Sequence, residues 1–333
     1  MNFSRKAGAV LLALSLVALT GACGNDDSSD TTAAGDADAG EPNGFTITID
    51  ADGISMPDEV VGGIVEVTLD TELKEAGPSF TRVTPGTTEE DFRKGAAGVV
   101  SGQPFPAFFE SSSGLEVERS TITLPEGDYF AWAIPDDPEA EGAEAEGAPE
   151  GEGPEGEGAP EGEGAPEGEG EGEGEGEGGP PPEAVVLKAF KVTAGEAGDL
   201  PELEDTITAR DYSFDVNITG GADEIVFRNE GPDQWHHAEI IGFGDLDPKE
   251  VEANLPKLFS SGPDAPPPAI FKDFDFDKSE AGSAAVFSPG LGGTTDVKIE
   301  SGKTYAVLCF ISDLTGGPPH AISKGMVNVF QAS

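Results

Sequence analysis

Three residues whose side chains bind soft metal ions lie close together near the C-terminus. Cys309, His320 and Met326 fall within one stretch of eighteen residues, CFISDLTGGPPHAISKGM. The whole 333-residue chain has only two cysteines, three histidines and three methionines. A thiolate, an imidazole and a thioether are the ligands that copper takes in electron-transfer sites. The stretch therefore indicates a copper-binding loop. The alternative is a buried thiol, a surface imidazole and a core thioether.

The other two histidines, His236 and His237, are neighbours in the segment WHHAEI. Side chains alternate between the two faces of a strand. If Ala238 and Ile240 face inward and Glu239 faces outward, His236 shares the inward face and is the favoured ligand. A bulge at the start of the strand would reverse this assignment and favour His237.

The N-terminus has the pattern of an export signal. Residues 1–22 begin with Arg5 and Lys6, continue with a short apolar stretch and end in small residues. The apolar stretch is too short to span a bilayer, which is typical of a cleaved signal peptide. Cys23 follows directly and resembles the cysteine of a bacterial lipobox, which implies lipidation of its sulfur, palmitate included. We therefore expect a protein anchored on the extracytoplasmic face of the cell membrane, or, if Cys23 is unrelated, an ordinary secreted one.

Two segments have compositions that cannot form a core. Residues 23–43 are rich in Asp, Ser, Thr, Ala and Gly, and residues 138–182 repeat Glu, Gly and Pro. We expect the first to be a disordered tether and the second a disordered acidic insertion. The net charge of -47 makes nucleic acid an unsuitable partner.

The remaining segments, residues 44–195 and 204–333, share landmarks in the same order. Each has a capped helix start, at Thr88 or Asp247, then a Ser-Gly pair followed by Pro-Ala, and later a Gly turn before a tyrosine. This order predicts an internal duplication. The rest of both segments consists of short alternating or β-branched runs between turn residues. The fold class we expect is all-β, with two tandem Greek-key β-sandwich domains, each with a short helix.

Residues 204–333 resemble the cupredoxins, the blue copper proteins that include plastocyanin and azurin. The resemblance depends on an Asn-Gly turn before the histidine pair and on the C-terminal pattern Y…C…H…GMV. It implies one type 1 copper ion bound by His236 or His237, Cys309, His320 and, axially, Met326. Residues 44–195 resemble the same family without the ligands, so we expect a degenerate, metal-free domain there.

One spacing departs from the simplest cupredoxins. Ten residues separate Cys309 from His320. We expect Gly316, Gly317 and the two prolines after them to fold the excess out as a turn.

These patterns predict a membrane-anchored, extracytoplasmic type 1 copper-binding protein. It would transfer electrons through its C-terminal domain to a redox or envelope protein of unknown identity. We expect no enzymatic activity, because copper oxidases and nitrite reductases need further histidines for a second copper centre and this chain has three in all. The alternative is a cupredoxin-like lipoprotein without metal that serves as a binding or envelope scaffold.

Overall fold

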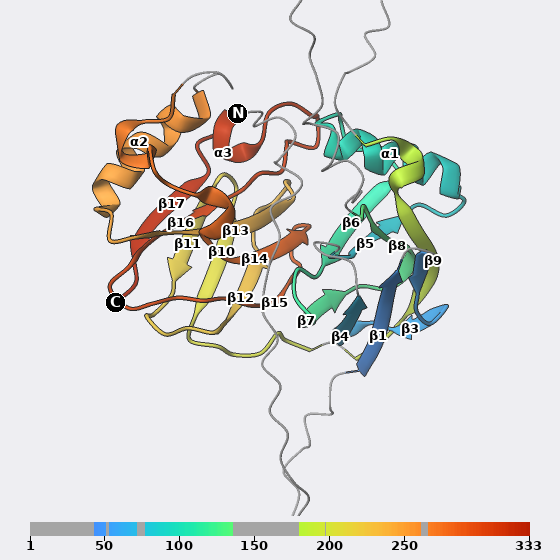
Figure 1. Ribbon diagram of the computed structural model, residues 1–333. Helices are drawn as coiled ribbons and strands as arrows, with labels where there is room; N and C mark the ends of the chain where they lie inside the picture. Colours follow the sequence, from blue (N-terminus) through green and yellow to red (C-terminus); the bar gives the residue numbers. More distant parts are fainter. Residues whose placement is uncertain (1–42, 51–52, 72–76, 136–179, 197, 261–265) are drawn as a thin grey trace, which may run out of the picture.

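The computed structural model describes residues 43–50, 53–71, 77–135, 180–196, 198–260 and 266–333. The predicted signal peptide, Cys23 with nearly all of the tether, and most of the acidic insertion lie outside the described residues. Within the described ranges the chain is mostly β-strand with few helices (Figure 1). No helix in these ranges is long and apolar enough to cross a lipid bilayer.

One pattern of strand pairing occurs twice along the chain. In the first half, residues 43–196, the strands pair in the order β2-β1-β4-β7, and in the second half, residues 198–333, the order is β11-β10-β12-β15. Strand β1 is parallel to β4 as β10 is to β12, and the other pairs are antiparallel. The bounds are β1 (Asn43–Asp50), β2 (Gly53–Ser55), β4 (Gly63–Thr71), β7 (Arg119–Leu124), β10 (Thr206–Arg210), β11 (Ser213–Asn217), β12 (Glu224–Asn229) and β15 (Gly292–Asp296).

Each half also has strands in a second sheet of its own. The orders are β3-β9-β8-β5-β6 and β14-β13-β16-β17. The bounds are β3 (Glu59–Val61), β5 (Ser79–Val83), β6 (Phe109–Gly114), β8 (Gly127–Ala133), β9 (Val186–Thr193), β13 (His236–Gly244), β14 (Glu280–Phe287), β16 (Thr304–Leu308) and β17 (Val327–Gln331). The repeated order accords with the duplicated landmarks. The Greek-key description and the domain boundaries stay predictions.

The two halves are joined through one continuous eight-stranded sheet. Strand β15 lies beside β7 (Figure 1), and the two strands pair where Gly293 is opposite Ile122. Beside this junction Ser288 N–H donates to Ser112 O, and Ser112 N–H donates to Ser288 Oγ. The main hydrophobic cluster contains buried residues of both halves. The halves therefore share backbone pairing and a core.

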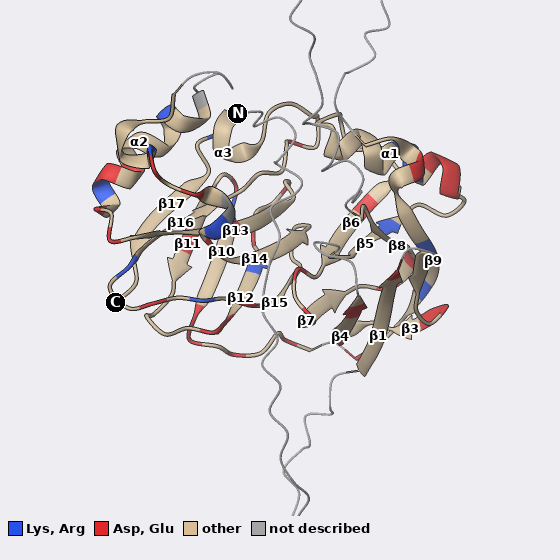
Figure 2. Ribbon diagram, in the orientation of Figure 1, with Lys and Arg blue, Asp and Glu red and all other residues tan. Residues whose placement is uncertain are grey.

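The helices begin where the sequence predicts. Helix α1 (Glu89–Val100) has Thr88 as its N-cap, whose hydroxyl accepts from Asp91 N–H, and its first turn is acidic (Figure 2). Helix α2 (Pro248–Ser260) follows Asp247, whose carboxylate accepts from Lys249 N–H. An acceptor at this position satisfies backbone donors that have no partner inside the helix. Short helices occur at η2 (Pro182–Ala184), η3 (Ala269–Phe271), η4 (Phe276–Lys278) and α3 (His320–Ser323).

Glu239 lies on the face of β13 opposite Ala238 and Ile240, as strand alternation predicts, but this outward-facing side chain is buried. Ala238 and Ile240 lie in the main core, whereas Ile241, on the other face of β13, packs in a cluster with Leu255 of α2. Glu239 is only 9% exposed, and its side chain has Ser283, Glu280 and Glu116 as neighbours. Burial, with smaller contributions from nearby carboxylates, raises the pKa of Glu239 well above its ordinary value.

We expect the chain to unfold in one cooperative transition, because the main core crosses the junction. Phe80, in the first half, and Phe227, in the second, are fully buried in this core. Phe80→Ala and Phe227→Ala should each lower the free energy of unfolding by about 3–5 kcal/mol. Exposed Val100→Ala is the control and should change it by less than about 0.5 kcal/mol. Urea unfolding followed by circular dichroism measures the free energy of unfolding. Two separate transitions, one shifted only by Phe80→Ala and the other only by Phe227→Ala, would contradict the single cooperative transition.

Candidate metal centre

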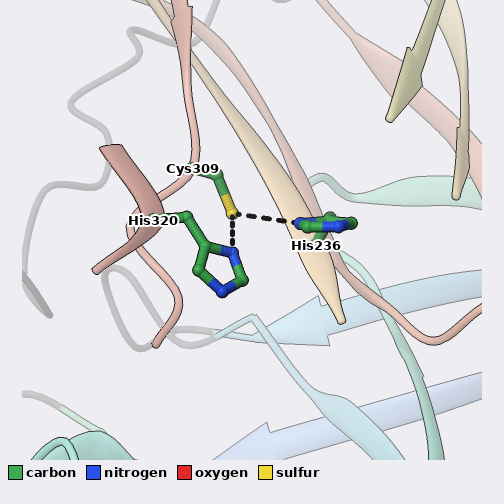
Figure 3. A group of neighbouring side chains, drawn as sticks. All are labelled: His236, Cys309 and His320. Carbon is green, nitrogen blue, oxygen red and sulfur yellow. Dashed lines mark hydrogen bonds between the residues drawn. The ribbon is translucent and has the colours of Figure 1, made fainter. Parts of the chain in front are cut away.

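The structure brings His236, Cys309 and His320 together from three separate places in the second half (Figure 3). His236 is the first residue of β13, Cys309 follows the last residue of β16, and His320 is the first residue of α3. All three side chains are fully buried, and their ligand atoms lie within 4.8 Å of one another. Among the described residues, these three side chains form a group that could hold a metal ion.

The two sulfur–nitrogen distances match those of a trigonal metal site. Cys309 Sγ lies 3.7 Å from His236 Nδ1 and 3.5 Å from His320 Nδ1 (Figure 3). Metal–sulfur bonds of about 2.3 Å and metal–nitrogen bonds of about 2.0 Å, at about 120°, would separate sulfur from nitrogen by about 3.7 Å. The donor set, two imidazoles and one thiolate, is the one that type 1 copper uses. The residues present therefore fit a copper ion.

A buried asparagine shapes the turn that leads to His236. Asn229 Oδ1 accepts from Gly231 N–H, and its Nδ2 donates to Gln234 O and Phe287 O. These bonds satisfy the amide inside the protein, where an unpaired polar group would be costly. They connect the end of β12 to the start of β13 in a fixed turn.

Backbone hydrogen bonds hold the Cys309, His320 and Met326 segments against one another. Ala321 N–H donates to Cys309 O, Met326 N–H donates to His320 O, and Cys309 N–H donates to Met326 O. Met326 is fully buried in the same cluster as Cys309. The backbone of Met326, the predicted axial residue, is thus hydrogen-bonded to the backbones of both Cys309 and His320. Its role as a metal ligand stays a prediction.

His237 lies outside the group. Its Nε2 accepts a hydrogen bond from Phe310 N–H, which occupies the lone pair that a metal would need. The structure therefore places His236 in the group, as strand alternation indicated, and gives His237 a different contact. This bond connects β13 to the residue directly after Cys309.

Burial sets the protonation states of the group. It lowers the pKa of His236 to about 3, with His320 and His237 adding repulsion, and it lowers the pKa of His320 as well. Burial raises the pKa of the Cys309 thiol to about 12, although backbone hydrogen bonds from His237 and Ile311 act in the opposite direction. At neutral pH the imidazoles are neutral and able to bind a metal, while the thiol keeps its proton.

A polar network that the sequence analysis missed lies beside His320. Asp313 Oδ1 is 3.3 Å from His320 Nε2 and accepts from Tyr212 OH at 2.7 Å. Lys324 Nζ lies 2.9 Å from Asp313 Oδ2 and 4.8 Å from the centre of the Tyr212 ring. The sequence held one signal for it: Asp313 and Lys324 stand in the segments that join the three C-terminal ligand candidates. The network places a paired carboxylate next to the group.

Comparisons with known proteins give low similarity. No family model and no curated protein matches the sequence. Among solved structures the chain is similar to sodium-dithionite-reduced auracyanin from the photosynthetic bacterium Roseiflexus castenholzii, with 20% identity, 38% of this chain and 94% of that chain covered, and a TM-score of 0.24. It is also similar to auracyanin B, with 18% identity, 38% of this chain and 86% of that chain covered, and a TM-score of 0.25. The similarity to copper nitrite reductase from Nitrosomonas europaea has 12% identity, 88% of this chain and 94% of that chain covered, and a TM-score of 0.19. TM-scores this low establish no family, so the interpretation of the site depends on its own geometry.

Copper(II) binding should release one proton near pH 7. The folded thiol has a pKa of about 12, so it must lose its proton to bind the metal, and the apparent affinity should rise about tenfold per pH unit between about pH 7 and 9. His236, with a pKa of about 3, is already neutral there and releases none. Calorimetric titrations in buffers of different ionisation enthalpy count the protons. Cys309→Ser is the control, and an affinity independent of pH would contradict the assignment of Cys309 as the thiolate.

Proposed function

We propose that this chain is a type 1 copper-binding protein that transfers electrons and performs no catalysis of its own. The observation that carries the proposal is the buried group of His236, Cys309 and His320, with both Nδ1 atoms at trigonal spacing from the sulfur. The resemblance of residues 204–333 to cupredoxins supports the same function.

Each residue of the site has a definite part in this function. Cys309 supplies a thiolate after losing its proton, and His236 and His320 supply neutral nitrogen atoms. We assign Met326 as the weak axial ligand because it is buried and bonded through its backbone to both Cys309 and His320. A bound copper ion would supply one-electron transfer between its two oxidation states. The buried surroundings exclude water and hold the ligands in nearly the same positions in both states.

The proposal extends to the cell envelope. The lipobox-like sequence around Cys23 supports lipid anchoring at the extracytoplasmic face of the membrane, and the acidic composition supports a protein partner with a basic surface rather than nucleic acid. With three histidines in the sequence, all near one site, a second copper centre of the oxidase kind is not part of the proposal. A metal-free scaffold lipoprotein is the alternative function.

Copper(II) titration of the purified full-length chain tests the proposal. We expect one equivalent to bind and to produce an intense thiolate-to-copper visible band. Cys309→Ser should abolish the band because it removes the sulfur. Two variants serve as matched controls and should retain it: Cys23→Ser, which removes the other cysteine, and His237→Gln, which changes the neighbouring histidine. A folded wild-type chain without the band would leave the scaffold alternative.

The carboxylate beside His320 should lower the reduction potential of the bound metal. Asp313→Asn removes a negative charge that favours the more positive oxidation state, so the potential should rise by on the order of tens of millivolts. Asp245→Asn is the matched control, because Asp245 also pairs with a lysine, Lys303, but on the surface. Voltammetry of the copper-loaded variants measures the effect. An unchanged or lower potential in Asp313→Asn would contradict it.

A further inference from the structure

The long loop between Cys309 and His320 packs against the first half of the chain. Phe105 N–H donates to Leu314 O at 2.9 Å, and Gly317 N–H donates to Gly102 O at 3.0 Å. Gly316, with a φ of 81°, lies so close that a Cβ there would meet Pro104 N at 2.8 Å. The glycines do form the expected turn, with Gly316 N–H donating to Asp313 O. The turn docks on residues 102–105 and does not project freely.

The same part of the first half contacts the segment that carries His236. Trp235, the residue before His236, is buried. Its ring meets the Phe105 ring edge-on at 4.8 Å between centroids and stacks on the Phe109 ring at 6.3 Å, with only 6° between the planes. Leu314 N–H also donates to Gln234 Oε1, which connects the loop to this segment.

We propose that residues 102–109 of the first half act as a clamp that positions the metal ligands of the second half. One short segment touches both the loop before His320 and the residue before His236. Phe105 takes part in both contacts, through its backbone and its ring, and is a positioning residue in this proposal. The half that carries no ligands thereby acquires a role in the metal centre.

A clamp is physically useful because the loop is long. A loop that opens locally exposes its ends at a free-energy cost much smaller than that of global unfolding. Metal sites need ligands held within about 0.5 Å of the productive geometry by supporting contacts. Docking on residues 102–105 restricts the loop before any metal arrives, which also protects the Cys309 thiol from solvent.

A pair of glycine variants tests the loop side of the clamp without any metal. Gly316→Ala places a Cβ against the backbone of Pro104 and Gly102 and should push the loop away. Gly302→Ala is the matched control, with a φ of 77° and no atom within 4 Å of the added Cβ. In a Cys23→Ser background the only thiol is Cys309. Its rate of modification by a thiol reagent should rise about tenfold in Gly316→Ala relative to Gly302→Ala, a difference of about 1.4 kcal/mol in the opening equilibrium.

A pair of aromatic variants tests the ring contact. Phe105→Ala removes the ring from Trp235, whereas Phe45→Ala removes a half-buried ring of the first half that lies outside the clamp and meets Phe80 edge-on. We expect faster thiol modification, faster loss of copper to a chelator and a changed charge-transfer band in Phe105→Ala, and wild-type values in Phe45→Ala. Phe105→Tyr keeps the ring and should restore the wild-type values.

The outcomes separate this inference from the proposed function on which its copper measurements depend. If the wild-type chain binds no copper, the proposed function fails, and the thiol rates still test the clamp. Modification rates in Gly316→Ala and Phe105→Ala within twofold of their controls would overturn the clamp, whatever copper does. Urea unfolding of each variant identifies any that is globally unfolded. If Phe105→Ala is globally unfolded, the milder variant Phe105→Leu replaces it, and its thiol modification rate is judged by the same twofold criterion.

Discussion

The site depends on burying two imidazoles and a thiol in contact with one another inside a protein core. Cys309 Sγ lies 3.7 and 3.5 Å from two ring nitrogens, and all three side chains are fully buried. Burial keeps the rings neutral and the thiol protonated, so the group is stable without charge and ready to exchange a proton for a metal ion. An arrangement of this kind needs strong support from its surroundings, and the rest of the fold supplies it.

That support comes from both copies of the duplicated strand pattern. The second half contributes the candidate ligands, the Asn229 turn and the hydrogen bonds among the Cys309, His320 and Met326 segments. The first half shares an eight-stranded sheet with it and meets the ligand loop through residues 102–105. In a chain with two copies of one strand pattern, one copy can carry the candidate ligands while the other supplies supporting surfaces. The contacts of Phe105 are an example of the second role.

Much of the site could be predicted because its residues are rare in this sequence. Cys309 and His320 stood out by residue type alone, and strand alternation favoured His236 over His237 but left both open, since a bulge could reverse the order. The helix caps at Thr88 and Asp247 could also be predicted from the sequence, because capping depends on residues within one turn of the helix. The burial of Glu239 was not predictable, because its neighbours Glu116, Glu280 and Ser283 come from distant parts of the chain. The docking of Leu314 and Gly317 on the first half joins segments about two hundred residues apart, and no local pattern reports such a contact. The contact of Asp313 with His320 was likewise not predictable, because it depends on the fold bringing Tyr212 and His320 to the same carboxylate.

The most direct test of the account is X-ray absorption spectroscopy at the copper edge on the copper-loaded full-length chain, with its Cys309→Ser and His237→Gln variants. The account predicts one sulfur at about 2.3 Å and two imidazole nitrogens at about 2.0 Å from the metal in the wild type. The short sulfur distance should disappear in Cys309→Ser, and the spectrum should be unchanged in His237→Gln. A wild-type spectrum without short sulfur, or one altered by His237→Gln, would contradict the central claim that His236, Cys309 and His320 form the metal centre.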